Sequence, residues 1–259
     1  MTEINNIKDS RIDHYRNLKF TPPGHKRDMV FIAEGEKVTL KLLKSGLEVI
    51  SSFALKDYYE RYPELFVRVP EDSRFTSDVD IFEKIIGFKV HTGIMAMGKI
   101  PPYKRPEELN GTIICANAIV DSENIGSICR NCAAFGFGSF LFDKQSSTPW
   151  LRRAVRVSMG AVFDLDVGFS MDLKTTIHGL KKSAYKVVAA ETTDDAIPLE
   201  KYSPREKQLI IFGNESHGIS EDILKLCDDK IYIPISDKIP SINVAATSAV
   251  IMHNIRKLC

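Results

Sequence analysis

Apolar residues recur along the chain in short runs, and segments with one apolar face separate the runs. In the first hundred residues the runs predict strands at 29–33, 47–54 and 65–69, and the segments between them predict helices at 35–45, 55–61 and 77–86. Beyond Pro106 the runs are longer and predict strands at 112–120, 139–143, 185–191, 207–213 and 230–235. Helical segments separate these, at 124–135, 149–157, 171–183, 219–226 and 241–257. Nearly continuous apolar strands alternating with helices are typical of an α/β fold whose parallel sheet is covered on both faces.

A proline-rich stretch interrupts this alternation. The sequence GKIPPYKRPEE holds Pro101, Pro102 and Pro106 within six residues. Proline removes backbone donors and fixes φ, so neither a helix nor a central strand tolerates three of them. The pattern therefore predicts a smaller α/β domain at 1–100, a linker at 101–110, and a larger α/β domain at 111–259.

Composition excludes several classes of protein. The 259 residues are 44% apolar, and 35 Lys and Arg stand against 34 Asp and Glu. Such a chain can bury a proper core, which excludes a disordered, collagen-like or disulfide-scaffold protein. The near-neutral total gives no sign of a polyanionic partner. If the protein binds nucleic acid, we expect a local basic patch to do so.

Cysteine usage and the chain's start indicate the compartment. Five cysteines without framework spacing indicate reduced thiols, so we expect a cytoplasmic protein. The N-terminal residues lack the apolar core of a secretory signal, and no apolar stretch is long enough to span a membrane. Cys129 and Cys132 form a CxxC without a second pair. We therefore expect buried helix residues there and no metal site.

Polar loops follow three of the predicted strands, where ligands of parallel α/β sheets bind. The first loop, at 121–138, carries Asn124 and Arg130. The second, GNESHGIS at 213–220, places Glu215 between two glycines that let the main chain approach a ligand closely. The third, at 239–250, has Ser241 and Asn243 on either side of Ile242.

Structural explanations of these loops remain open at this point. Asn124 can cap the helix that follows it, which leaves Arg130 as a surface residue. Ser220 can cap the helix after the second loop, and Ser241 can cap the last helix. Capping by Ser241 is compatible with a second role for the same residue.

Taken in order, the three loops resemble the signature motifs of the SpoU (TrmH) family of SPOUT methyltransferases. The matching segments are ENIGSICRNCAAFG, IIFGNESHGIS and IPISDKIPSINVAATSAVI. Each is weak alone, and the ordered set is specific. The segment FIAEGEKVTLKLLKSG at 31–46 resembles the family's substrate-binding domain, a small ribosomal-protein-like α/β fold. The family usually has a proline after the aspartate of the first motif, where this chain has Ser122.

The resemblance implies S-adenosylmethionine-dependent methylation of a ribose 2′-hydroxyl in RNA. It also implies a trefoil-knotted domain and a homodimer with sites at the interface. Carried residue by residue, it assigns the methyl-donor pocket to Gly213, Asn214, Glu215, Gly218, Ile233, Ile242 and Asn243. It assigns catalysis or contact with the reacting RNA to Asn124, Arg130, Glu215, Ser241 and Asn243.

The role of Arg130 stays open between two alternatives. The family proposal makes this arginine a general base, but deprotonating a guanidinium at pH 7 costs roughly 7 kcal/mol. We favour a grip on the neighbouring phosphate and stabilisation of the nascent alkoxide. Glu215 is expected to orient Asn124 or Arg130.

Two basic segments are candidates for RNA contact. Residues 8–27 include Arg11, Lys26 and Arg27, and the segment after the first motif's strand carries Arg152, Arg153 and Arg156. A solvated helix face is the alternative explanation of both. Phosphate contact is favoured for the second segment, because it would flank the catalytic loop.

Among functions, the pattern favours a ribosomal RNA methyltransferase, because an additional N-terminal domain resembles the ribosomal RNA members of the family. The alternatives are a transfer RNA ribose methyltransferase and a non-catalytic RNA-binding or ribosome-assembly module. A dinucleotide-binding oxidoreductase lacks support, since no GxGxxG with a following acidic residue occurs.

Overall fold

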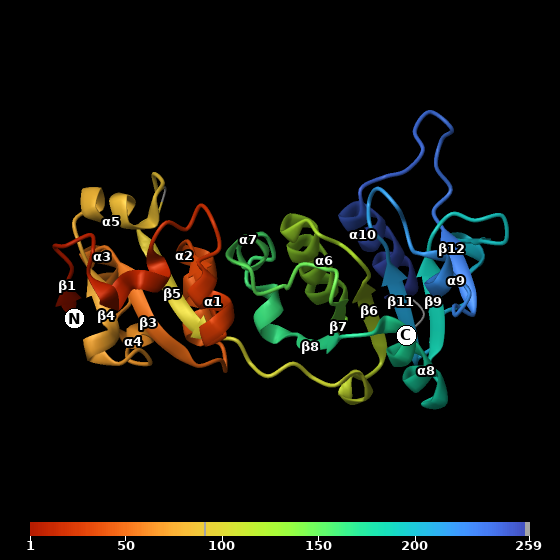
Figure 1. The fold of residues 1–259 in the computed structure, drawn as a ribbon, viewed down its shortest axis with the longest axis horizontal. Helices are drawn as coiled ribbons and strands as arrows, with labels where there is room; N and C mark the ends of the chain where they lie inside the picture. Colours follow the sequence, from red (N-terminus) through yellow and green to blue (C-terminus); the bar gives the residue numbers. More distant parts are fainter. Residues whose placement is uncertain (91, 257–259) are drawn as a thin grey trace. The chain divides into compact units, whose positions relative to one another are not determined.

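The computed structural model describes residues 1–90 and 92–256. The chain forms two compact units (Figure 1). The first comprises Met1–Pro101 and Trp150–Phe163, and the second comprises Pro102–Pro149 and Asp164–Cys259. The chain passes from one unit to the other within the predicted proline-rich linker. Residues 150–163 differ from the expectation, because they belong to the first unit and not to the C-terminal domain.

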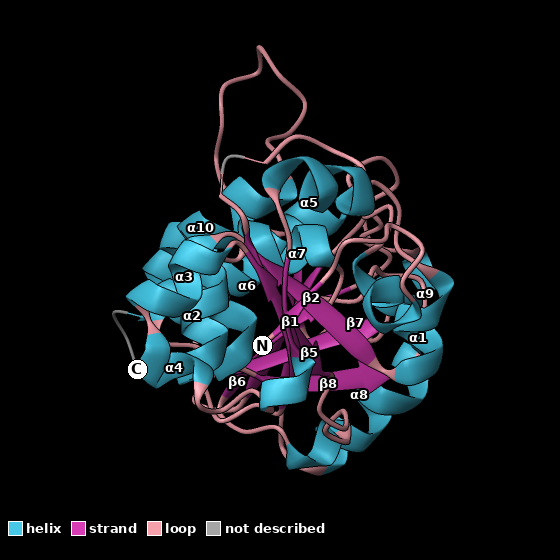
Figure 2. Cartoon of the chain, turned by 90° about the vertical axis from the view of Figure 1, so that its left-hand side faces the viewer, coloured by secondary structure: helices cyan, strands magenta, loops and turns pink. Residues whose placement is uncertain are grey.

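The first unit is built on a mixed five-stranded sheet of order β1-β4-β3-β5-β2. Figure 2 shows strands β1, β2 and β5 of this sheet in magenta. Its strands are β1 (Thr2–Glu3), β2 (Val30–Glu34), β3 (Val49–Ala54), β4 (Arg74–Thr76) and β5 (Ile94–Lys99). Its helices are α1 (Pro23–Asp28), α2 (Glu36–Lys44), α3 (Lys56–Arg61), α4 (Pro63–Phe66), α5 (Val79–Ile86) and α7 (Arg152–Val157). Short 3-10 helices cover Ser10–Tyr15 and Glu71–Ser73. Apolar faces drive the packing: α2 buries Val38, Leu42 and Leu43, as the spacing predicted.

The prediction of a strand at 65–69 is wrong. Residues 63–66 form α4, which Pro63 opens at a position where a helix needs no backbone donor. Strand β5 was missed because its sequence, IMAMGK, has few β-branched residues. It pairs antiparallel with β2 and β3. A Cβ at Gly98 would lie 2.5 Å from the ring of Phe31, so only glycine fits this position.

Aromatic packing explains why residues 150–163 belong to the first unit. The ring of Phe31 on β2 lies 4.9 Å from the ring of Trp150 and 5.5 Å from that of Phe163. All three side chains are buried. Burial of aromatic rings is among the largest hydrophobic gains available to a side chain. The segment is thus anchored by a contact that the sequence pattern does not reveal.

The second unit is built on a seven-stranded sheet of order β10-β12-β9-β11-β6-β7-β8, in which every pairing is parallel. Its strands are β6 (Thr112–Ala116), β7 (Ser139–Asp143), β8 (Asp166–Ser170), β9 (Lys186–Ala190), β10 (Ile197–Pro198), β11 (Gln208–Phe212) and β12 (Asp229–Tyr232). The parallel sheet is confirmed. Strands β8 and β10 were not predicted, since the first mixes polar and apolar residues and the second is two residues long.

Four helices accompany this sheet: α6 (Ser122–Phe135), α8 (Leu173–Lys182), α9 (Glu221–Leu224) and α10 (Val244–Ile255). Ile177 and Leu180 of α8 pack with Ile113 and Leu209 of the sheet. Helices α6 and α10 pack together, and the Asn131 side-chain amide donates to the Ala245 carbonyl and the Ser248 hydroxyl, each at 2.9 Å. Over the described residues, no helix is long and apolar enough to cross a membrane.

Candidate active site

The three predicted loops lie at the carboxyl ends of β6, β11 and β12, strands of one parallel sheet. Strand β11 lies between β6 and β9, and β12 pairs with β9. The segment after β6 leads into α6, the segment after β11 is the loop 213–219, and the segment after β12 leads into α10 (Figure 1). Because all these strands are parallel, their polar ends lie at one edge of the sheet.

A chain of side-chain hydrogen bonds joins the three loops. The Asn124 amide on α6 donates to the Glu215 carboxylate, and the Asn243 amide donates to Oδ1 of Asn124 at 3.1 Å. Asn124 is only 9% exposed, so its bonds are made largely out of water. We call Asn124, Glu215 and Asn243 the Asn124 cluster. Glu215 was expected to orient either Asn124 or Arg130, and in the structure its hydrogen-bond partner is Asn124.

Helix caps differ from the expectation. Asp121, not Asn124, caps α6, since its side chain accepts from the Glu123 amide at 2.8 Å. Asn243, not Ser241, caps α10 by accepting from the Ala245 amide at 2.8 Å. Neither of these two capping alternatives is observed. A capping aspartate frees the Asn124 side chain for Glu215, and helix α6 forms with Ser122 at its first position.

The loop 213–219 is fixed by its own polar contacts. The Asn214 amide donates to the Ala118 carbonyl at 2.8 Å, and its oxygen accepts from the amides of Ser216 and His217 at 2.8 and 3.2 Å. Gly218 has φ +63°, and a Cβ there would lie 2.5 Å from a carboxylate oxygen of Glu191. Glycine is thus required at this turn by conformation and by space.

Two acidic residues that the sequence analysis missed support this loop. Glu191, directly after β9, accepts a hydrogen bond from the Ile219 amide at 2.9 Å. Asp143, the buried end of β7, accepts from the Asn117 side chain at 2.7 Å and from the Ala118 amide at 3.1 Å. Both stand at the carboxyl end of a parallel strand, and this position was the available signal.

A cavity of about 490 Å³ opens between the second and third loops. Every residue predicted for the methyl-donor pocket lines it: Gly213, Asn214, Glu215, Gly218, Ile233, Ile242 and Asn243. Ser241 and Glu191 line it as well. Its wall combines apolar side chains such as Ile233 and Ile242 with main chain and carboxylates, which suits a ligand with one flat apolar part and several polar groups.

Arg130 is not brought to this cavity. It lies on α6, six residues beyond Asn124, and its side chain is exposed. Among the described residues it has no hydrogen-bond or ion-pair partner. Six residues advance the helix by about 9 Å, so Arg130 and Asn124 lie far apart along one helix.

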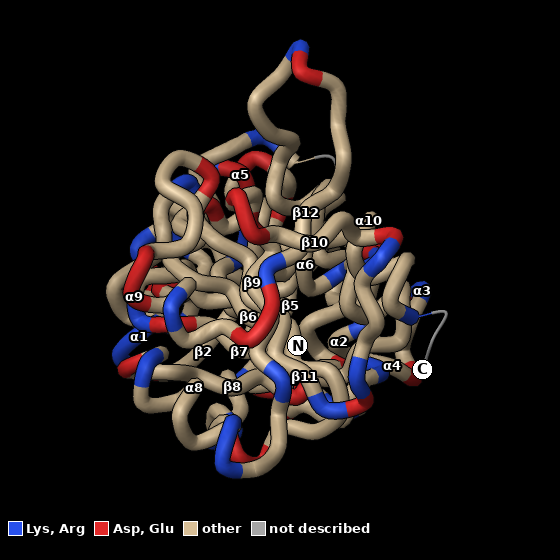
Figure 3. Tube along the Cα trace, turned by 90° about the vertical axis from the view of Figure 1, so that its right-hand side faces the viewer, with Lys and Arg blue, Asp and Glu red and all other residues tan. Residues whose placement is uncertain are grey.

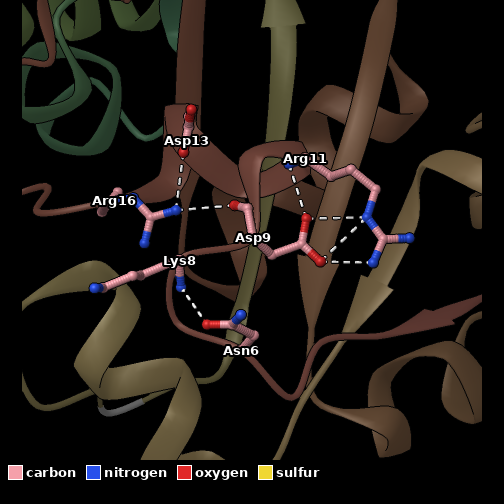
Figure 4. Close-up of polar contacts among 6 residues, drawn as sticks. All are labelled: Asn6, Lys8, Asp9, Arg11, Asp13 and Arg16. Carbon is pink, nitrogen blue, oxygen red and sulfur yellow. Dashed lines mark hydrogen bonds and ion pairs between the residues drawn. The ribbon is translucent and has the colours of Figure 1, made fainter.

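Most of the predicted RNA-contacting arginines are engaged with carboxylates. Arg11 makes a bidentate pair with Asp9 (Figure 4), which lowers the pKa of Asp9 to about 2. Arg27 pairs with Asp28 at 2.8 Å. Lys26 and Arg153 have exposed side chains. Figure 3 shows acidic and basic residues interspersed along the chain.

Arg152 and Arg156 share the carboxylate of Glu34. Arg152 hydrogen-bonds to it, with side chains 18% and 13% exposed, and Arg156 lies 3.7 Å from its other oxygen. The Arg152 guanidinium also lies over the Phe88 ring at 5.2 Å from its centroid. This arginine is therefore part of the packing of the first unit.

The prediction that Cys129 and Cys132 are buried helix residues is confirmed. Cys129 and Cys132 are fully buried on α6, and burial raises the pKa of both thiols. In the part of the chain that the structure describes, no group of three or more His, Cys, Asp or Glu could hold a metal ion.

Residues 111–253 match the SpoU rRNA Methylase family, which is more than half of the chain. The chain belongs to the SpoU family. Among curated relatives, an uncharacterized tRNA/rRNA methyltransferase of Mycobacterium tuberculosis is 26% identical over 254 residues, covering 95% of this chain and 88% of the relative. The 23S rRNA (guanosine(2553)-2′-O)-methyltransferase RlmP of Bacillus subtilis is 22% identical over 261 residues, covering 99% of this chain and 100% of the relative.

Two solved structures share the fold of nearly the whole chain. The rRNA methyltransferase from Sinorhizobium meliloti has a TM-score of 0.86 in one crystal structure and of 0.85 in a second, AdoMet-bound crystal structure. The complex is 17% identical and covers 99% of this chain and 97% of that chain. At this identity the likeness shows the fold. The SpoU match spans most of the second unit together with residues 150–163 of the first, and it includes the whole Asn124 cluster.

Proposed function

We propose that the protein transfers the methyl group of S-adenosylmethionine to a ribose 2′-hydroxyl of ribosomal RNA. The observation that carries the proposal is the Asn124 cluster beside the 490 Å³ cavity, within the matched part of the chain. The B. subtilis relative that aligns over the full length is named as a 23S rRNA 2′-O-methyltransferase, which favours ribosomal over transfer RNA.

The residues of the cavity fit S-adenosylmethionine. Ile233 and Ile242 offer an apolar surface for the adenine ring, and the loop 213–219 offers main-chain groups for its polar edge. Gly218 lets the loop adopt a φ of +63° and lets the Glu191 carboxylate approach the main chain closely. When bound, S-adenosylmethionine supplies a methyl group on a positively charged sulfur.

The Asn124 cluster would position the reacting hydroxyl. Glu215 accepts the Asn124 amide, and this fixes which way the Asn124 side chain points. Asn243 is held at the start of α10 by its own cap hydrogen bond, so it holds Asn124 from the other side. A constellation fixed in advance spares the cost of ordering it during the reaction.

We infer that Arg130 acts in a homodimer, on the site of the partner subunit. Its exposure and its distance along α6 from Asn124 support this arrangement. A guanidinium there would grip the RNA phosphate beside the reacting ribose and stabilise the developing alkoxide. Ser241, exposed on the cavity wall, is proposed to contact the same RNA.

We propose that the first unit binds the RNA substrate. A second cavity, of about 530 Å³, lies within this unit, and its lining includes Phe88, the cations Lys37, Lys89 and Arg156, and the carboxylates Glu34 and Glu36. Cations beside an aromatic ring suit phosphate contact and base stacking. The cavity supports the expectation for Arg156. Arg11, Lys26, Arg27, Arg152 and Arg153 stay candidates for RNA contact.

The finer features of the fold are proposals of the same kind. We propose a ribosomal-protein-like fold for the N-terminal domain, a trefoil knot in the C-terminal domain, and a cytoplasmic location. The return of the chain to the centre of the sheet at β11, before α10 packs on α6, supports a threaded path.

A non-catalytic RNA-binding module is the competing function. Calorimetric titration with S-adenosylmethionine separates the two. The enzyme is expected to bind one molecule per chain and to methylate ribosomal RNA, whereas absence of binding would favour the module.

A further inference from the structure

Glu191 stands where no motif assigned a role, on the wall of the proposed cofactor cavity. It follows β9 directly and is half-buried. Its main-chain amide donates to the Ile231 carbonyl at 3.0 Å, which fixes the residue against β12. One carboxylate oxygen accepts from the Ile219 amide at 2.9 Å. The residue thus ties the end of one strand to the glycine-rich loop after another.

The charge of the cavity wall gives this carboxylate a second role. The described residues that line the cavity include two carboxylates, Glu191 and Glu215, and neither lysine nor arginine. Glu215 accepts from the neutral side-chain amide of Asn124, and Glu191 accepts from the neutral backbone amide of Ile219. Neither negative charge is cancelled by a lysine or arginine of the wall, and Glu191 is the carboxylate that lies outside the Asn124 cluster.

We propose that Glu191 makes the cavity selective for the charge of its ligand, so that it prefers S-adenosylmethionine to S-adenosylhomocysteine. This inference rests on the proposed function of the same cavity. S-adenosylmethionine carries a net charge of +1 at neutral pH, and the product that has lost the methyl group is neutral overall. A carboxylate in a half-enclosed cavity attracts the net positive charge of S-adenosylmethionine and has no net charge to attract in S-adenosylhomocysteine.

Such selectivity favours turnover. Methyl transfer removes the positive charge from the ligand, and the attraction to Glu191 is lost at the same moment. Product release then costs less than release of the substrate would. Glu191 acts here as a specificity-determining residue toward the ligand and as a positioning residue toward Ile219.

The two roles are separable by substitution. Glu191→Gln keeps an oxygen that can accept from the Ile219 amide and removes the charge. Glu191→Ala removes both. Glu206→Gln removes an exposed carboxylate of the same unit, away from the residues that line the cavity, and serves as the control. Thermal unfolding of each variant reports whether the fold is kept.

The experiment is calorimetric titration of each full-length variant with S-adenosylmethionine and with S-adenosylhomocysteine. Glu191→Gln is expected to weaken the affinity for S-adenosylmethionine about tenfold and the affinity for S-adenosylhomocysteine less than about twofold, because only S-adenosylmethionine carries a net charge. Glu191→Ala is expected to weaken both. Glu206→Gln should match the wild type, and added salt should reduce the preference of the wild type.

Three results would overturn the proposal. If Glu191→Gln loses affinity equally for both ligands, Glu191 only anchors the loop through the Ile219 amide. If both affinities are unchanged, Glu191 has no role in ligand binding. If the wild-type protein binds neither ligand, the proposed function fails together with the charge selectivity. The first two results leave the proposed function intact.

Discussion

The Asn243 amide donates a hydrogen bond to Oδ1 of Asn124 at 3.1 Å, across 119 positions of sequence. Asn243 simultaneously caps α10, and Asn124 donates onward to Glu215. The start of each of two helices is thereby tied to the loop between β11 and α9. Three segments that are each weak as motifs form one hydrogen-bonded unit beside a cavity.

Replacing Asn124 tests this unit. Asn124→Ala removes the donor to Glu215 and the acceptor for Asn243, so we expect methyl transfer to fall at least about a hundredfold. Affinity for S-adenosylmethionine should stay within about twofold, because Asn124 does not line the cavity. Single-turnover rates measure methyl transfer, and calorimetry measures the affinity for S-adenosylmethionine. Asn110→Ala, an exposed asparagine of the same unit, is the control. A tenfold loss of cofactor affinity would show instead that the cluster shapes the cavity.

The location of Arg130 predicts complementation between defective subunits. Arg130→Ala and Asn124→Ala should each be inactive alone. After the two are mixed and allowed to exchange subunits, about a quarter of the wild-type sites should recover, since each mixed dimer holds one intact site. Methyl transfer before and after exchange measures this. Arg130→Lys should also fail, because it loses the planar fork. Failure of the mixture to recover would place Arg130 at the site of its own chain.

Gly218 is expected to tolerate no side chain. Gly218→Ala would adopt an unfavourable φ of +63° and place Cβ 2.5 Å from the Glu191 carboxylate, so either that carboxylate or the loop must shift. We expect a loss of about 1–3 kcal/mol in stability and a clear loss of cofactor affinity. Gly138→Ala is the matched control, since nothing lies within 4 Å of its Cβ. Thermal denaturation and calorimetry compare them, and equal behaviour would refute the tight-turn argument.

Arg152 is expected to contribute to the stability of the fold more than to RNA binding. Its removal leaves Glu34, 13% exposed, with only the longer contact to Arg156 at 3.7 Å, and removes the guanidinium over Phe88. We expect Arg152→Ala to cost about 1–3 kcal/mol in denaturant unfolding. Arg27→Ala, whose side chain is 78% exposed, should cost far less. A variant with unchanged stability and weakened RNA binding would restore Arg152 as a phosphate ligand.

RNA affinity should depend on the cavity of the first unit. Lys37→Gln and Lys89→Gln are each expected to reduce the salt slope of RNA binding by about one phosphate contact. Arg11→Gln should change the slope less, because Arg11 already pairs with Asp9. Binding isotherms over a range of salt concentrations give the slopes. An unchanged slope for both lysine variants would exclude this cavity from the RNA interface.

Strands with continuous apolar sequence were predictable, because a strand that is buried on both faces of a sheet carries apolar residues at nearly every position. Strand β11, with five buried residues, is the clearest case. The predicted strand at 65–69 failed because Pro63 opens a helix there, and β5 was missed because Met, Ala and Gly carry little strand signal. The association of Trp150 with Phe31 joins residues that no local pattern connects.

The site was predictable to a similar extent. The ordered motifs located the loops, and all seven residues expected in the methyl-donor pocket line one cavity. Glu191 and Asp143 were missed because each looks like an ordinary acidic residue until the topology places it at the same sheet edge. The sequence left the caps open because Asp121, Asn124, Ser241 and Asn243 are all good capping residues, and only the observed hydrogen bonds distinguish them.

The most direct test of the central claim is a map of ribose methylation in ribosomal RNA from cells that lack the protein. The account predicts that one 2′-O-methylated nucleotide is lost, that wild-type protein restores it, and that Asn124→Ala does not. A ribosomal RNA methylation map identical with and without the protein would contradict the account.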